Sequence, residues 1–162
     1  MRSPMREHEN IGCLIGRIVE AYSEVQGIEI ISVASMTVKC ASLAKGFEAD
    51  ESYYVTHAAQ VLSQTEMDFE VDPPPDLVVE IEMTSSAIEK LKLFAAMNVP
   101  EVWRHNGELL RMYRLENAEY REIDCSVELP GLDAQRINEI VLRRNSVGET
   151  KLIREFRTSI SG

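Results

Sequence analysis

The sequence lacks any apolar run that approaches the roughly 20 residues of a membrane-spanning helix. Its first ten residues, MRSPMREHEN, also lack the apolar segment of a signal peptide. We therefore expect a protein that stays out of the membrane and lies, by default, in the cytoplasm. The 162 residues have a mass of 18.3 kDa, which is enough for one domain, residues 1–162, with a substantial core.

Cysteine and histidine are both scarce. Three cysteines are scattered along the chain without a CxxC pair: Cys13, Cys40 and Cys125. Isolated cysteines in odd number predict neither a disulfide framework nor a zinc site. Three histidines lie far apart in the sequence and form no ligand motif: His8, His57 and His105. We interpret each histidine as a polar residue at the surface or at an edge.

Positive charge is also in short supply. The net charge is −10 and the isoelectric point is about 4.8, so the chain lacks the basic footprint that nucleic-acid-binding proteins usually carry. Tight nonspecific DNA binding is therefore not expected. A nuclease remains compatible with this charge, because a metal site concentrates acidic residues and divalent ions offset them locally.

The most informative stretch is residues 73–103, PPPDLVVEIEMTSSAIEKLKLFAAMNVPEVW. Three prolines form an extended lead-in, and the β-branched run after them predicts a strand over residues 77–83. Side chains alternate along a strand, so Glu80 and Glu82 share one face and lie roughly 7 Å apart. Burying an unpaired charge is costly, so this face is expected either to be solvated or to hold a cation.

A helix is predicted after this strand, beginning near Ser86 and running to about Met97. Ser86 and Glu89 have the spacing of a capping box, and apolar residues recur at helical spacing beyond them. Lys90 then falls in the first turns of the helix, close to the strand end that carries Glu82. The next strand begins at Val102 and Trp103, so the two acids and the lysine gather at a strand–helix–strand junction.

The remaining pattern is helix, strands, helix, strands, helices, which predicts an α/β sandwich with a mixed sheet. Trp103 and Phe94 are expected in its core. Helices are predicted over residues 6–25, 57–64, 133–144 and 149–157. Predicted hairpins pair residues 28–34 with 36–40 and residues 102–104 with 108–115, with further strands over 52–55 and 120–125 and a loop over 42–47.

Two segments carry a resemblance to a known family. PDLVVEI, then a helix with Lys90 and Phe94, then NVPEVW, resembles the Uma-two family of bacterial restriction-endonuclease-like proteins, which is placed in the PD-(D/E)XK nuclease superfamily. GFEADESYYV is similar to the family segment in which a Pro-Asp dipeptide opens a strand, with Ala49 here in place of the proline. The resemblance covers nearly the whole chain and implies a restriction-endonuclease-like mixed sheet flanked by helices.

The resemblance also implies a site. Asp50 and Glu80 would be ligands of Mg²⁺ or Mn²⁺, with the Ile81 backbone carbonyl as a third oxygen donor. The superfamily motif has lysine two residues after the second acid, and this chain has Glu82 there, as a further ligand or a general base. Lys90 is the candidate substitute for that lysine, and a surface ion pair is an equally favoured interpretation of it.

A further acid, on the first predicted helix, is also a candidate for this site. In the superfamily an acid on the first helix sometimes joins the metal, and Glu20 occupies that helix, although a solvated helix face is the favoured interpretation.

Three functions are compatible with these residues. The first is a magnesium-dependent endonuclease that hydrolyses phosphodiester bonds, with DNA as the expected substrate. The second is a catalytically inactive binding or assembly module that kept the nuclease fold, as Glu82 and the acidic charge suggest. The third, compatible with either of the others, is a homo-oligomer, expected to be a homodimer, whose C-terminal helices form the interface.

Overall fold

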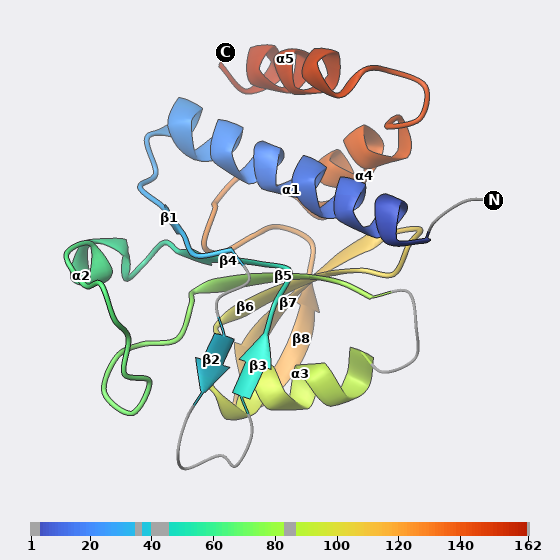
Figure 1. Cartoon of the computed structure of the whole chain (residues 1–162). Helices are drawn as coiled ribbons and strands as arrows, with labels where there is room; N and C mark the ends of the chain where they lie inside the picture. Colours follow the sequence, from blue (N-terminus) through green and yellow to red (C-terminus); the bar gives the residue numbers. More distant parts are fainter. Residues whose placement is uncertain (1–3, 35–36, 40–45, 83–86, 162) are drawn as a thin grey trace.

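The computed structural model describes residues 4–34, 37–39, 46–82 and 87–161 and has the α/β architecture that the sequence predicts (Figure 1). A six-stranded mixed sheet has the order β1-β4-β5-β6-β7-β8, and β2 and β3 form a separate two-stranded sheet. In chain order the elements are α1 (Pro4–Gln26), β1 (Ile31–Ser32), β2 (Thr37–Lys39), β3 (Gly46–Glu48), β4 (Glu51–Tyr54), α2 (Ala58–Val61), β5 (Leu77–Ile81), α3 (Ala87–Ala96), β6 (Glu101–His105), β7 (Leu110–Glu116), β8 (Glu119–Ile123), α4 (Ala134–Leu142) and α5 (Glu149–Ile160).

The pairing of β5 with its two neighbours positions the candidate site. β5 and β6 are parallel, and α3 connects them, so both strands end at the same edge of the sheet. β4 is antiparallel to β5, with Glu51 opposite Val79, so β4 begins at the edge where β5 ends. Residues just before β4, at the end of β5 and in the first turn of α3 are therefore brought together, although they are far apart in sequence.

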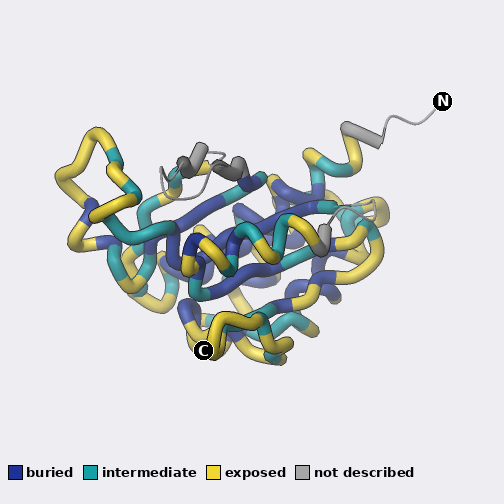
Figure 2. Tube along the Cα trace, turned by 90° about the horizontal axis from the view of Figure 1, so that it is seen from below, coloured by how far each residue is buried: buried dark blue, intermediate teal, exposed yellow. Residues whose placement is uncertain are grey.

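Helices cover both faces of the sheet. α1, α4 and α5 lie on one face and α3 lies on the other (Figure 1). Figure 2 shows the central strands buried between these layers. Leu77, Val79 and Ile81 of β5 point into the larger core under α1, while Val78 points into the smaller core under α3, so the predicted alternation is confirmed. Trp103 and Phe94 are buried, as predicted.

The predicted helices are present. α1 buries an apolar stripe and ends at Gly27, whose φ of +69° is the left-handed conformation that glycine adopts readily. The N–H of Ile28 closes the helix by donating to the carbonyl of Ser23 at 2.9 Å, which is the Schellman pattern. None of the helices in the described part of the chain is long and apolar enough to cross a membrane.

The C-terminal strands pair as the sequence predicts, β6 with β7 and β7 with β8, all antiparallel. Asn106 stabilises the first turn because its side-chain oxygen accepts from the N–H groups of Glu108 and Leu109, each at 2.9 Å. Gly107 supplies the positive φ, +97°, that the turn requires.

The first predicted hairpin is wrong. The run over residues 28–34 gives only the two-residue strand β1, which pairs with β4 and not with β2. Two local features shorten it: Ile28 is used in the helix end, and Ala34 takes a positive φ of 46°, which interrupts an extended strand. β2 pairs instead with β3, which occupies the end of the predicted loop over 42–47. Met36 and Cys40 lie outside the described residues.

The interpretation of His105 as a surface or edge residue is also wrong. Its side chain is fully buried, and its Nδ1 accepts from the N–H of Gly107 at 3.0 Å. Burial lowers the pKa of His105 to about 4, and the charge of Arg144 adds to this effect, while Glu7 opposes it. The folded protein therefore holds this imidazole neutral.

We expect His105 to make the free energy of unfolding depend on pH. The unfolded state takes up the proton below its ordinary pKa of 6.5, whereas the folded state does so only near 4, so stability is complete above pH 6.5 and falls with decreasing pH. Between pH 7.5 and 4.5 the loss from this residue is about 2.5 kcal/mol. Denaturant titrations followed by the fluorescence of Trp103 would measure it. His105→Asn should lose this part of the pH dependence, and identical pH profiles of the two proteins would contradict the assignment.

Candidate functional site

Asp50 and Ile81 meet where β5 extends beyond the first residue of β4. The N–H of Ile81 donates to Asp50 Oδ2 at 2.7 Å. The carbonyl oxygen of Ile81 is 2.7 Å from His8 Nε2, which is also 3.6 Å from Asp50 Oδ2. The side chains of Asp50 and His8 thus provide partners for the N–H and the carbonyl of Ile81, which have none in β4. Two of the predicted donors, Asp50 and the Ile81 carbonyl, are therefore neighbours.

Glu80 and Lys90 form an ion pair on the α3 side of the same strand end. The Glu80 side chain is only 4% exposed, and its Oε1 accepts from Lys90 Nζ. Lys90 Nζ is also 3.7 Å from Glu82 Oε2, which confirms the predicted proximity of Lys90 to Glu82. A solvated face is thus wrong for Glu80, and the cation beside it in the structure is an ammonium group.

The second oxygen of Glu80 has no comparable partner. Oε2 is buried and makes no hydrogen bond within the described part of the chain. A buried carboxylate oxygen left unpaired is costly, and in native structures it often marks a functional group or an ion position. Glu80 therefore keeps one buried carboxylate oxygen that is open to a cation at this strand end.

The electrostatics of the pair agree with this interpretation. Burial raises the pKa of Glu80, and the charge of Asp50 adds to that shift; the hydrogen bond and charge of Lys90 and the backbone N–H of Asp50 oppose it. For Lys90, burial opposes the charged form, but the hydrogen bond and charge of Glu80 and the charge of Glu82 outweigh burial and raise its pKa. Lys90 therefore stays cationic at neutral pH, beside a carboxylate whose charge is destabilised.

The surroundings of Asp50 are acidic as well. The pKa of Glu51 is raised by burial first and then by the charges of Asp50, Glu20 and Glu9. Perturbed carboxyl groups that gather in this way are characteristic of functional sites and create a local field that attracts cations.

His8 is the residue that the sequence analysis missed. Besides Ile81 and Asp50, its ring contacts an exposed carboxylate, with Nδ1 3.3 Å from Glu9 Oε1. Because the Ile81 carbonyl only accepts, Nε2 is the ring nitrogen that donates in this arrangement. No local motif identifies His8, since Asp50 and Ile81 lie more than forty residues away in sequence.

The donor chemistry suits a hard divalent ion. Asp50, Glu80 and the Ile81 carbonyl offer oxygen ligands, which Mg²⁺ and Mn²⁺ prefer. Within the described ranges, however, no three side chains of His, Cys, Asp or Glu are already arranged to hold a metal. The carboxylates are held instead by Lys90, by the Ile81 N–H and by His8. The oxygen donors that suit a divalent ion thus lie at one strand end. They do not surround a common point at which an ion would be bound.

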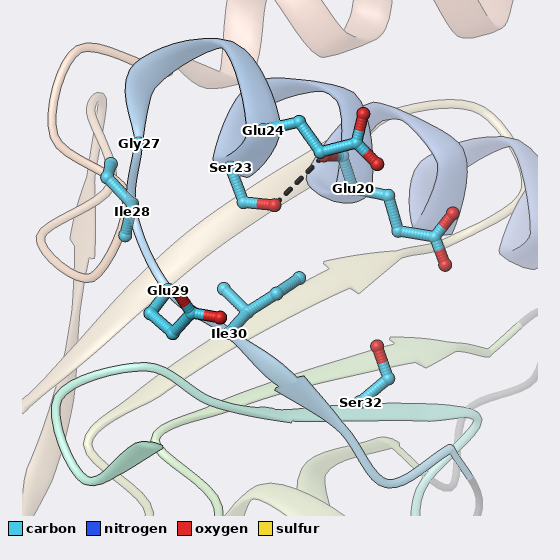
Figure 3. Close-up of a pocket in the computed structure, with 8 residues that line it drawn as sticks. All are labelled: Glu20, Ser23, Glu24, Gly27, Ile28, Glu29, Ile30 and Ser32. Carbon is cyan, nitrogen blue, oxygen red and sulfur yellow. Dashed lines mark hydrogen bonds between the residues drawn. The ribbon is translucent and has the colours of Figure 1, made fainter. Parts of the chain in front are cut away.

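Glu20 makes no contact with these donors among the described residues, although its charge acts on Glu51. It follows His8 by twelve residues, which is about 18 Å along an α-helix, and its side chain is exposed. Glu20 lines a separate pocket of about 400 Å³ between the end of α1 and β1 (Figure 3). This position agrees with the solvated face favoured for it.

Other sequence-based assignments have mixed outcomes. Cys13 and Cys125 are free and exposed, which agrees with the absence of a predicted disulfide for these two residues. His57 lies at the other end of β5, where Nδ1 is 2.6 Å from Asp76 Oδ1, and it takes no part in this site. Ser85 and the predicted helix cap Ser86 lie outside the described residues.

The mixed sheet, the helices on both faces, and the acids and lysine at the end of β5 define an α/β protein with a restriction-endonuclease-like fold. Residues 1–143 match the model of the Uma2 family, which is described as "Putative restriction endonuclease". The chain therefore belongs to the Uma2 family, as the sequence motifs suggested. None of the curated proteins compared matches it.

Proposed function

We propose that this protein is a divalent-metal-dependent endonuclease that hydrolyses phosphodiester bonds of DNA. Asp50, Glu80 and the Ile81 carbonyl are the proposed ligands, with Mg²⁺ or Mn²⁺ as the ion. The observation that carries the proposal is the buried Glu80, with one unpaired oxygen, beside Asp50 and Lys90 in a chain of a restriction-endonuclease-like family.

Each residue has a distinct role in this proposal. A bound divalent ion supplies a water nucleophile that deprotonates near neutral pH and offsets the charge that develops on the phosphate. Lys90 takes the task of the motif lysine, because its ammonium group stabilises negative charge on the phosphate oxygens. Glu82, mostly buried and 3.7 Å from Lys90, holds that ammonium in place and is the nearest candidate for a general base.

The first test is calorimetric titration of Mg²⁺ and Mn²⁺ into the wild-type protein and the Glu80→Gln variant. We expect saturable binding to the wild type and an affinity at least about tenfold lower in the variant, because an uncharged amide is a poor ligand for a hard cation. Glu89→Gln is the matched control, since Glu89 is an exposed glutamate in the first turn of the same helix that carries Lys90. Equal binding by all three proteins would contradict the proposed ligand set.

A catalytically inactive nuclease-fold module is the second candidate. Glu82 at the lysine position favours it, and so does the ion pair by which Lys90 already compensates Glu80. Its expected result is a wild type that binds neither metal saturably and cleaves no DNA with either ion.

For both candidate functions we propose a homodimer whose interface is formed by the C-terminal helices, which sedimentation or size-exclusion measurements would test.

A further inference from the structure

On the α3 face of the sheet, two arginines follow Glu80 on successive strands. Strand register places Arg104 of β6 beside Glu80, and Arg111 of β7 directly opposite Arg104. Val78 and Val102 of the same strands point into the core under α3, so Glu80, Arg104 and Arg111 all project from that face. At the usual spacing between neighbouring strands, Arg111 lies two strands, or roughly 10 Å, from Glu80. Lys90 borders it at Glu80.

The two arginines are poorly compensated. Within the described residues Arg104 forms no ion pair, and its Nε is buried without a hydrogen-bond partner. Arg111 is 45% exposed, and its ion pair within the described part of the chain is with Glu122, whose carboxylate oxygen is 3.9 Å from Arg111 Nε, which is a weak surface pair. Like charges directly opposite each other on neighbouring strands destabilise a sheet. The two arginines therefore leave weakly compensated positive charge on this face of the sheet.

We propose that Lys90, Arg104 and Arg111 form a phosphate-binding row that holds the backbone of a DNA strand beside Glu80. Arginine suits this task because its planar guanidinium group binds phosphate oxygens in pairs. The row places positive charge beside the acids of the site, which gives an acidic protein a local surface for the phosphates of DNA. The proposal rests on the proposed nuclease function and adds where its substrate lies.

The test is fluorescence anisotropy of a short labelled DNA strand, and of the matching duplex, titrated with protein in EDTA between roughly 50 and 200 mM salt. We expect Arg111→Gln and Arg104→Gln each to weaken binding about 3- to 10-fold. Each should also reduce the slope of log affinity against log salt by about 0.7 to 0.9, the value for one lost phosphate contact. Arg111 is exposed, so Arg111→Gln keeps the test valid if Arg104→Gln folds poorly, and Arg104→Lys should restore most of the slope.

Arg121→Gln is the matched control, because Arg121 lies on β8 opposite Arg114, on the other face of the sheet, and is 76% exposed. We expect it to bind as the wild type does. The proposal is overturned if the wild type binds neither DNA, or if Arg111→Gln keeps the wild-type affinity and salt slope, or if Arg121→Gln weakens binding equally. Because EDTA removes metal, this result is independent of the metal titration, so either proposal can fail alone.

Discussion

Replacing Lys90 with methionine is expected to lower metal-dependent DNA cleavage by about 100- to 1,000-fold, the usual effect of removing one charge-stabilising donor. Methionine keeps the length and apolar stem of lysine but removes the ammonium group that Glu80 and Glu82 hold at the strand end. Metal binding should persist, because the competing cation beside Glu80 is gone. Single-turnover cleavage rates and metal titrations of the same variant would separate these two effects.

Lys92→Met is the control for this experiment. Lys92 lies two residues further along α3 and is exposed, so its replacement removes the same charge from the same helix without touching Glu80. We expect wild-type cleavage from Lys92→Met. If Lys90→Met also cleaves at the wild-type rate, Lys90 is only an ion-pair partner of Glu80, which is the alternative that the sequence left equally open.

Glu101→Ala is expected to destabilise the fold by about 3 to 5 kcal/mol, the range for breaking a buried charge network by removing one partner. Glu101 is fully buried at the start of β6. Its carboxylate accepts four hydrogen bonds, from Ser126 Oγ at 2.6 Å, Trp103 Nε1 at 2.7 Å, and the N–H groups of Val127 at 2.9 Å and Glu128 at 3.2 Å. Truncation would leave these donors unsatisfied in the interior.

Denaturant unfolding followed by Trp103 fluorescence measures this loss directly, since the indole is itself a partner of Glu101. Glu119→Ala on β8 is the matched control, because this glutamate is exposed and its truncation should change stability by no more than about 0.5 kcal/mol. A loss below about 1 kcal/mol for Glu101→Ala would show that the network contributes little. The fraction of Glu101→Ala that stays folded should bind metal as the wild type does. Glu101 is at the start of β6, whereas the candidate site lies beside the other end of that strand.

Local sequence determined most elements and the two faces of the central strand. Alternation of apolar and acidic residues predicted β5 and placed Glu80 opposite the larger core, and the spacing after it placed Lys90 within reach of Glu82. Asn106 and Gly107 predicted their hairpin because turn chemistry is a property of a few adjacent residues. The family resemblance, and not any periodicity, singled out Asp50.

Tertiary structure alone decided the long-range partners. His8 reaches Ile81, Glu101 is buried under Ser126, and β1 pairs with β4, because each pairing depends on which surfaces several distant elements bury together. The sequence therefore left open whether Glu80 is solvated or faces a cation. The tertiary structure resolved that choice, since Glu80 is buried and the Lys90 ammonium of α3 is its neighbour.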